Sequence, residues 1–262
     1  MSAIPSSGGN KAVQEGIRSL LRPDGVYEII LTEKHPGNRF DREVLSVLNG
    51  AFRQAEEKGA KAVLLSHEGD SFCLGGNLGD ARKQDAGSVR AFADQLSQVL
   101  FRIFYAQMPV VAALEGNAEG GGLSLVEACD MAAASWNARF GIPEMEAGMS
   151  PVISMSGAYR AIPEKKLLQM ALLAHRITAE EAERYGLITQ TVAPGSARTV
   201  CEDWIRAFSD RNPSSVSTIR RLRRDLDGGA YLRQVNAAAA LLPGNLLHRD
   251  TWNMLDRMDG EK

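Results

Sequence analysis

Cysteine is scarce in this chain, with three residues among 262. Cys73, Cys129 and Cys201 form no Cys-x-x-Cys pair and have no pair of histidines nearby, so neither a disulfide framework nor a zinc site is expected. Long apolar runs are also missing, since none approaches the roughly 18 residues of a membrane-spanning helix. The N-terminus carries no basic segment followed by an apolar one, so no secretory signal is expected. A soluble cytoplasmic protein is predicted.

The chain also lacks a large excess of positive or negative charge. The chain has 30 basic and 32 acidic residues and a formal net charge of −2, which excludes a strongly basic polymer binder, and nucleic acid is not expected as a partner. Hydrophobic residues make up 44% and charged residues 24%, an ordinary globular composition. A chain of this length can bury a large core in one α/β domain without disulfides.

Strands and helices alternate along the first part of the chain. A Pro-Asp-Gly turn at 23–25 separates two β-rich segments and predicts a hairpin. Asp41 is a good N-cap for a helix that Gly59 ends. Further strands are predicted at Ala62–Ser66, Val110–Leu114 and Met131–Ala134, and helices at Ser88–Tyr105 and Leu123–Ala128. This order predicts βαβ units and a layered α/β core.

Beyond about Pro151 the pattern becomes mainly helical. Helices are predicted at 163–174, 178–185, 196–210, 213–226, 229–241 and 246–258, with a strand at Leu187–Val192. We therefore divide the chain into a flexible tail at 1–14, a core at 15–195 that holds the site, and a helical region at 196–262. The last region is too small for a core of its own, so it is expected to pack on the first part or on a neighbouring subunit.

Two glycine-rich segments each follow an apolar strand. One is Phe72-Cys73-Leu74-Gly75-Gly76-Asn77-Leu78, and the other is Gly116-Asn117-Ala118-Glu119-Gly120-Gly121-Gly122. Glycines let backbone N–H groups approach a ligand, and two such turns can direct their N–H groups at one oxygen as an oxyanion hole. A single glycine cluster is usually just a turn. Neither segment has the phosphate-binding or dinucleotide-binding pattern.

The order of the sequence blocks is more specific than either turn alone. F-C-L-G-G-N-L is followed by M-P-V-V-A-A-L-E-G-N-A-E-G-G-G, then A-C-D-M-A-A-A and F-G-I-P-E. Over roughly residues 25–258 the chain resembles the crotonase (enoyl-CoA hydratase/isomerase) superfamily. The resemblance implies an α/β fold, a ClpP-like spiral of ββα units with a helical C-terminal region. It also implies assembly as a homotrimer or hexamer.

The resemblance further implies a coenzyme A thioester as substrate. Its carbonyl oxygen would lie between the backbone N–H groups of Gly76 and Gly121, where fixed donors stabilise the charge of an enolate. By resemblance, Leu74, Gly75 and Arg39 would contact substrate or coenzyme A. Coenzyme A would be part of the substrate, with no tightly bound cofactor and no metal. The acyl group, and the choice between coenzyme A and a carrier protein, stay open.

Glu144, in Phe-Gly-Ile-Pro-Glu, matches the family's catalytic acid or base. Hydratases of the family carry a second glutamate where this chain has Ser124, which we keep as a substrate contact. They also have a Gly-rich turn where Gly148–Ser154 contains apolar residues. One carboxylate suffices to move a proton from C2 to C4 of a 3-enoyl thioester, so double-bond isomerisation in fatty acid metabolism is favoured. The alternatives are enoyl-CoA hydration (a lyase activity) and a non-catalytic member that binds acyl-CoA or a partner.

Several other charged residues have two interpretations. Glu119 could face the pocket, but a surface or salt-bridged position is favoured, and Glu146 is expected to pair with a basic residue. Glu127 follows Ser124 by three residues and could share its face. The arginine cluster at 220, 221, 223 and 224 could be a solvated or salt-bridged face, a site for the phosphates of coenzyme A, or an RNA contact, the last being least favoured.

Overall fold

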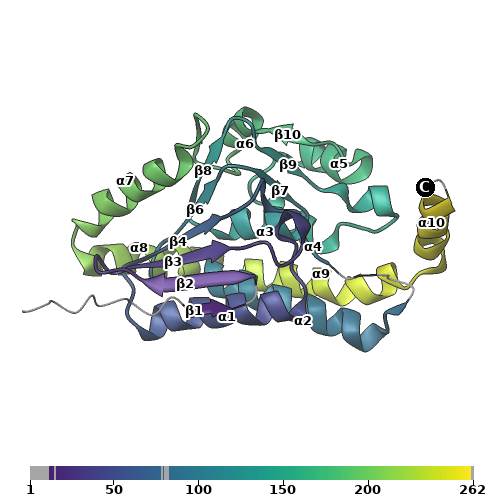
Figure 1. Cartoon of the computed structure of the whole chain (residues 1–262), viewed down its shortest axis with the longest axis horizontal. Coiled ribbons are helices and arrows are strands. Elements are labelled where there is room, and N and C mark those ends of the chain that lie inside the picture. The colour runs from purple at the N-terminus through teal and green to yellow at the C-terminus, as the bar shows by residue number, and fades with distance from the viewer. Residues whose placement is uncertain (1–11, 15, 78, 80–82, 261–262) are drawn as a thin grey trace, which may run out of the picture.

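The computed structural model describes residues 12–14, 16–77, 79 and 83–260, and it contains two β-sheets surrounded by helices (Figure 1). The larger sheet has the strand order β1-β2-β3-β4-β6-β8-β11, and the smaller one has the order β10-β9-β7-β5. The alternation of strands and helices in the sequence therefore gave the correct fold class.

The larger sheet starts with the predicted hairpin. β2 (Ile17–Leu21) pairs antiparallel with β3 (Val26–Leu31) across the 23–25 turn. β1 (Ala12–Gln14) pairs antiparallel with β2, so the prediction of a flexible tail is wrong for Ala12–Gln14. The free edge of β2 supplies backbone hydrogen-bonding groups to this segment, which its composition does not reveal. Residues 1–11 of the predicted tail lie outside the described residues.

Strands β4 to β9 form ββα units, as the resemblance implies. Each unit has one strand in the larger sheet, a short strand in the smaller sheet and then a helix. The units are β4 (Ala62–His67), β5 (Ser71–Cys73) and α2 (Ala86–Phe104); β6 (Val110–Leu114), β7 (Asn117–Glu119) and α3 (Gly121–Ala128); and β8 (Met131–Ser135), β9 (Arg139–Gly141) and α4 (Val152–Ala158). β3, β4, β6, β8 and β11 (Gln190–Val192) run parallel to one another.

The predicted helices are present, and some short elements were missed. Asp41 caps α1 (Arg42–Glu57) by accepting a hydrogen bond from the Val44 N–H. β7 lies inside the segment that we expected to be only a turn, and β9 and α4 were not predicted. These elements are too short for a periodic pattern to reveal them. The other short elements are η1 (Pro36–Asn38), η3 (Pro143–Ala147) and β10 (Ile177–Thr178).

The helical C-terminal part covers the core. It contains α5 (Glu164–Leu173), α6 (Ala179–Tyr185), α7 (Ala197–Ser209), α8 (Pro213–Asp227), α9 (Ala230–Leu246) and α10 (Arg249–Gly260). α9 packs against α2 and α4, and α7 packs against β6 and β8 (Figure 1). α7 and α9 thus bury apolar surface against the core of their own chain.

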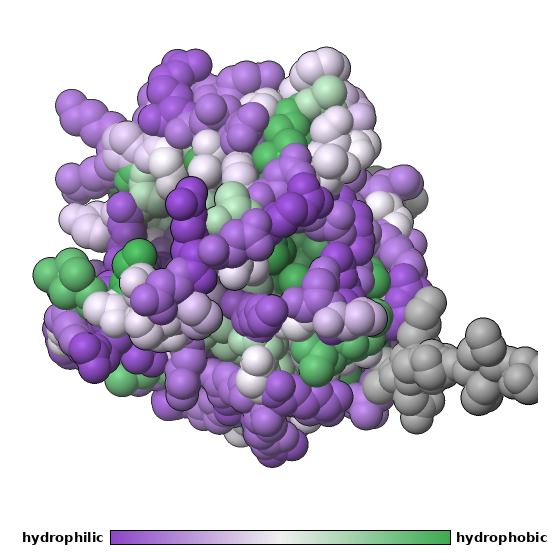
Figure 2. Space-filling view, turned by 90° about the vertical axis from the view of Figure 1, so that its left-hand side faces the viewer, coloured by the Kyte–Doolittle hydropathy of each residue, from purple (hydrophilic) through white to green (hydrophobic). Residues whose placement is uncertain are grey.

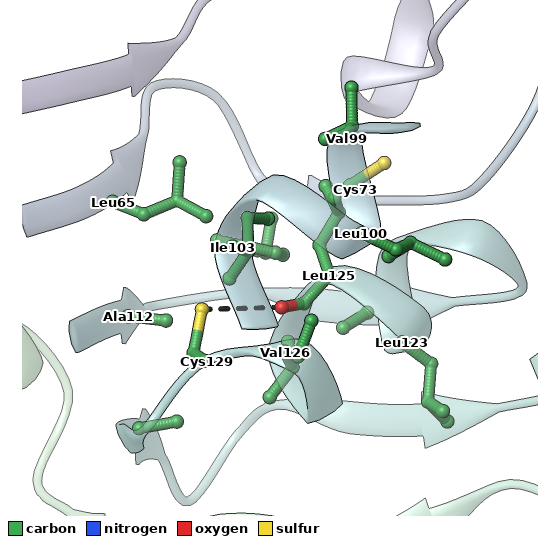
Figure 3. Packing of buried hydrophobic residues seen from close by; sticks show 14 of the residues in the cluster. Leu65, Cys73, Val99, Leu100, Ile103, Ala112, Leu123, Leu125, Val126 and Cys129 are labelled. Atoms are coloured by element: carbon green, nitrogen blue, oxygen red, sulfur yellow. Dashed lines mark hydrogen bonds between the residues drawn. The ribbon is translucent and has the colours of Figure 1, made fainter. Parts of the chain in front are cut away.

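Every residue of α3 is buried. Leu123, Leu125 and Val126 of this helix pack near Val99, Leu100 and Ile103 of α2 (Figure 3). The Cys129 thiol donates a hydrogen bond to the Leu125 carbonyl at 3.2 Å. All three cysteines are buried free thiols. The first residues of α3 are therefore held by a rigid packed layer.

Three arginines of the cluster, Arg220, Arg223 and Arg224, bind the C-terminal end of α2. Arg220 is 3% exposed, donates to the carbonyls of residues 103, 104 and 106, and forms an ion pair with Asp130. Arg223 and Arg224 donate to the carbonyls of residues 104 and 105. These carbonyls lie at the negative end of the helix dipole, which guanidinium groups stabilise. Of the three interpretations, the salt-bridged one fits Arg220 and Arg223.

The surface of one side of the molecule is mostly hydrophilic. Figure 2 shows small, separate hydrophobic areas there rather than one continuous apolar face. None of the helices in the described part of the chain is long and apolar enough to cross a membrane.

Candidate active site

A cavity of about 300 Å³ lies between the two glycine turns and the segment that contains η3 and α4. One wall is apolar and is made by side chains of α2, α4, α9 and the loop before α4. These side chains are Phe92, Leu96, Met149, Val152, Ile153 and Leu242. Polar and charged side chains also line the cavity, among them Arg39, Glu119, Glu144, Glu146, Ser154 and Arg176. Such a pocket suits a mainly apolar ligand with a few polar groups.

The two glycine turns touch each other at this cavity. Gly75 has φ of +87°, which favours glycine, and a Cβ there would lie 3.3 Å from the Gly121 nitrogen. Phe40 N–H donates to the Gly75 carbonyl, and Asn77 N–H donates to the Phe40 carbonyl. In this parallel pairing the N–H of Gly76 takes no part. Gly121 is the first residue of α3, so its N–H has no acceptor within the helix.

Gly76 and Gly121 each pack against an aromatic ring. A Cβ on Gly76 would lie 2.8 Å from the Phe92 ring, and one on Gly121 would lie 2.5 Å from the Phe40 ring. The two rings are stacked with centroids 6.2 Å apart. Side chains at these two positions would therefore push the turns away from their support. Gly76, Gly121, Gly75 and Leu74, to which the resemblance assigns substrate contacts, all line the cavity.

Glu144 brings a carboxylate to the same cavity. It is the second residue of η3, after Pro143. Its Oε1 accepts a hydrogen bond from the Ser154 hydroxyl, and a Cβ on Gly120 would lie 3.2 Å from that oxygen. Its Oε2 is buried and has no hydrogen-bond partner among the described residues. Burial raises the pKa of Glu144, and the Ser154 hydrogen bond opposes this rise.

Ser124 is not brought to the cavity. It lies in the second turn of α3, is 1% exposed, and its hydroxyl is 3.5 Å from the Gly120 carbonyl oxygen. It is absent from the residues that line the cavity, although the N-cap residue Gly120 and the first helical residue Gly121 are among them. The predicted substrate contact of Ser124 therefore has no counterpart in this arrangement, because the helix turns its side chain into the packed core.

Glu119 both faces the cavity and forms a salt bridge, which are the two positions that the sequence left open. It is 7% exposed and lines the cavity, and it also forms an ion pair with Arg176, whose Nε donates to Oε1 at 2.6 Å. Arg176 Nη1 donates to Glu146 Oε1 at 2.8 Å, as expected for a paired Glu146. A Cβ on Gly141 would lie 2.9 Å from Arg176 Cγ, so the glycine of β9 leaves room for this arginine.

Arg39 holds the first glycine turn. Its Nη1 donates to the carbonyl of Leu74, and the Gly76 carbonyl lies 3.5 Å away. The Leu74 N–H in turn donates to the Gly37 carbonyl at 2.9 Å. Arg39 thus lines the cavity as predicted, but it also stabilises the shape of the turn that carries Gly76.

Glu127 lies at the other end of α3, away from the cavity. It is 9% exposed, and its Oε1 lies 3.8 Å from Arg160 Nε. A Cβ on Gly157 would lie 2.3 Å from its Oε2, so α4 packs closely on the carboxylate. Burial raises the pKa of Glu127 to about 7. Within the described part of the chain, no group of three or more His, Cys, Asp or Glu residues could hold a metal ion.

Sequence reasoning missed three residues that line the cavity, namely Ser154, Arg176 and Leu242. Ser154 contacts Glu144 from a helix that was not predicted. Arg176 comes from the loop before β10, and Leu242 comes from α9, far along the chain. An isolated serine, arginine or leucine gives no local signal of a site, because only the packing of distant segments brings it there.

The chain is similar in sequence to proteins of one known family. The sequence model of the family described as enoyl-CoA hydratase/isomerase matches residues 22–245. The chain is 26% identical over 241 residues to probable enoyl-CoA hydratase 2, mitochondrial, of Arabidopsis thaliana, covering 90% of this chain and 77% of that protein. It is 30% identical over 157 residues to the short-chain-enoyl-CoA hydratase of Clostridium acetobutylicum, covering 59% and 60% of the two chains.

Solved structures share the fold over nearly the whole chain. An enoyl-CoA hydratase from Bacillus halodurans superposes with a TM-score of 0.84 at 22% identity, covering 92% of this chain and 99% of that one. An enoyl-CoA hydratase/isomerase from Xanthobacter autotrophicus Py2 gives a TM-score of 0.84 at 25% identity, covering 95% of each chain. The spiral of ββα units is thus common to this chain and to these proteins.

Proposed function

Because the chain belongs to the enoyl-CoA hydratase/isomerase family, the enzymes of the crotonase superfamily, we propose that it isomerises a 3-enoyl thioester of coenzyme A to the 2-enoyl thioester. The observation that carries this proposal is the state of the carboxylates. Three glutamates line the cavity, but Glu119 and Glu146 are both paired with Arg176, whereas Glu144 keeps a buried oxygen with no partner among the described residues.

This isomerisation needs one carboxylate to move the proton and two N–H donors to stabilise the enolate oxygen. Glu144 takes a proton from C2, and the electrons of the broken C–H bond form a C1=C2 double bond while the thioester oxygen becomes negative. The N–H groups of Gly76 and Gly121 stabilise that oxygen. The electrons of the dienolate then take the proton at C4, the double bond moves to C2=C3, and the C1=O bond forms again. No atom is gained or lost, and Glu144 ends as a carboxylate.

The neighbourhood of Glu144 is poorly suited to holding a water. Met149, Val152 and Ile153 line this part of the cavity, and Ser124 puts no second acid or base into it. Hydration needs a water to be activated as well as a proton to be delivered. These residues favour the transfer of a proton between two carbons of one substrate.

Enoyl-CoA hydration is the second candidate. The observation that favours it is Glu119, a further carboxylate that lines the cavity. Several relatives are also named as hydratases. Hydration through Glu119 would require the carboxylate to leave its 2.6 Å contact with Arg176 or to act from within it.

The two candidates separate in one assay. Matched-length 2-enoyl, 3-enoyl and 3-hydroxyacyl thioesters of coenzyme A would be incubated with the enzyme, and products followed by enoyl absorbance and by mass. We expect 3-enoyl isomerisation to outpace 2-enoyl hydration, and the Glu144→Gln variant to lose it. Faster hydration at matched length would refute isomerisation as the main activity, and loss of neither reaction in Glu144→Gln would refute the role of Glu144.

We also propose that the enzyme assembles as a homotrimer or hexamer. The resemblance to the family supports this assembly, and light scattering over a broad concentration range tests it. A monomer throughout that range would refute it.

A further inference from the structure

The two carboxylate oxygens of Glu144 lie in different surroundings. Oε1 accepts the hydrogen bond of the Ser154 hydroxyl and lies beside the Gly120 backbone. Oε2 is buried but has no hydrogen-bond partner among the described residues. A buried carboxylate oxygen without a partner is costly. Glu127 Oε2 is in the same state but does not line the cavity, whereas Glu144 does, so only Glu144 can gain a partner that arrives with the substrate.

Ser154 is placed for this contact by an otherwise apolar segment. It is the third residue of α4, is 3% exposed, and follows Val152 and Ile153, which line the apolar part of the cavity. Burying a hydroxyl among such neighbours costs free energy unless it is hydrogen-bonded. Glu144 is the partner of this hydroxyl.

The backbone holds both groups in fixed positions. Met149 N–H donates to the Glu144 carbonyl at 2.9 Å, which closes the loop between η3 and α4. Ser150 N–H donates to Asn245 Oδ1 of α9 at 2.6 Å, and Asn245 Nδ2 donates to the Ser150 hydroxyl at 2.8 Å. These hydrogen bonds join η3, the loop before α4, and α9, and they thereby set the relative position of Ser154 and Glu144.

We propose that Ser154 is a positioning residue that occupies Oε1 of Glu144 and thereby assigns proton transfer to Oε2. This inference rests on the proposed isomerisation for its kinetic consequence, but the contact itself is independent of the reaction. With Oε1 occupied, the oxygen that takes the proton from C2 is the one that returns it at C4. A proton that stays on the one buried oxygen exchanges little with solvent.

The charged groups around Glu144 fix the direction of the effect on its acidity. Burial raises the pKa of Glu144; the Ser154 hydrogen bond and the charge of Arg39 lower it, and the charge of Glu119 raises it. Arg176 and Glu146 complete the charged lining and compensate each other in an ion pair. Removal of the hydroxyl therefore raises the pKa of Glu144, because the ionised carboxylate loses a donor.

Ser154→Ala is the test variant, Ser154→Thr keeps a hydroxyl, and Ser156→Ala is the matched control. Ser156 lies on the same helix, but its hydroxyl donates to the Ile153 carbonyl at 2.7 Å. The first measurement is a pH titration by NMR of protein labelled with ¹³C at the glutamate carboxyl carbon, with Glu144→Gln assigning the signal. We expect the Glu144 midpoint to rise by about one pH unit in Ser154→Ala. It should return toward the wild-type value in Ser154→Thr and stay unchanged in Ser156→Ala.

The second measurement follows a deuterium label from C2 of a 3-enoyl thioester into C4 of the product in ordinary water. The wild-type enzyme should retain label, and Ser154→Ala should retain less, because the freed Oε1 gives the proton a second position and a route to solvent. Its kcat below the new midpoint should fall about tenfold with little change in KM.

The outcomes distinguish this inference from the proposed function. An unchanged Glu144 midpoint in Ser154→Ala overturns the role of Ser154, whatever the reaction is. A raised midpoint in an enzyme that does not isomerise 3-enoyl thioesters supports the contact and refutes isomerisation. If isomerisation occurs and label retention is equal in wild type and Ser154→Ala, the single-oxygen transfer is wrong.

Discussion

One glutamate lies at each end of α3, and the surroundings of the two carboxylates differ. At the N-terminal end, Glu144 has a hydroxyl donor on one oxygen and a cavity beside it. At the C-terminal end, Glu127 is enclosed by α4, and Arg160 lies 3.8 Å away. Burial raises the pKa of both carboxyls. A raised pKa by itself therefore does not mark the active site, and access to a cavity separates the two groups.

The Glu144→Gln variant should cause the largest effect and thus tests the cavity end of α3. We expect turnover to fall by about 10²–10⁴-fold, since the proton acceptor is removed while shape is kept. Thioester binding should change little, because the oxyanion contacts at Gly76 and Gly121 are backbone groups. Steady-state kinetics and calorimetric binding measure the two quantities.

Glu146→Gln is the control for this variant, because Glu146 lies in the same η3 segment and is paired with Arg176. Its turnover should stay within a few-fold of wild type. A loss at Glu146 or Glu119 that exceeds the loss at Glu144 would show that the base has been assigned to the wrong carboxylate.

The Glu127→Gln variant tests the enclosed end and should change stability rather than turnover. The folded pKa of Glu127 is about 7, above its usual value of 4.5, so the folded state holds a proton that the unfolded state releases between these values. The free energy of unfolding of the wild type therefore falls as pH rises from about 4.5 to about 7. The amide of the variant does not titrate, so the variant should gain relative stability on the order of 3 kcal/mol across that interval.

Urea denaturation of the wild type and the Glu127→Gln variant at pH 5 and pH 8 measures this difference. Turnover of the variant serves as the control and should stay near that of the wild type, since Glu127 does not line the cavity. A stability difference that does not depend on pH would show that Glu127 titrates at its ordinary value in the folded protein.

The Glu119→Gln variant sharpens the comparison by changing a charge near Glu144. The charge of Glu119 raises the pKa of Glu144, so its removal should move the rising limb of the kcat–pH profile to lower pH. The shift should be small, a few tenths of a pH unit, as for a charge that acts through an already compensated ion pair. Glu146→Gln, which removes the more exposed partner of Arg176, should move the limb less. A shift to higher pH in Glu119→Gln would contradict this electrostatic account.

Ser124→Ala should have the smallest effect. The hydroxyl lies 3.5 Å from the Gly120 carbonyl oxygen and away from the cavity lining, so turnover and KM should both stay close to the wild-type values. A clear rise in KM would restore Ser124 as a substrate contact and would mean that the middle of α3 also takes part in binding.

The elements with strong local patterns were predicted well. The hairpin, α1, α2 and β6 lie within a few residues of the predicted ranges, because turn residues, an N-cap and helical periodicity are encoded locally. β7, β9 and α4 were missed because short segments carry no period. Their structure depends on pairing with strands and helices that lie elsewhere in the chain.

The sequence alone determined the glycine turns and the carboxylate of Glu144, through glycine positions and block order that the resemblance made specific. Only the tertiary structure decided what each acidic residue does. Arg176, which lies in a distant loop, forms ion pairs with Glu119 and Glu146. Glu127 is enclosed by α4, and Ser154 of α4 donates a hydrogen bond to Glu144. The physical reason is that the state of a carboxylate depends on its donors and its burial, and distant segments of the chain supply both.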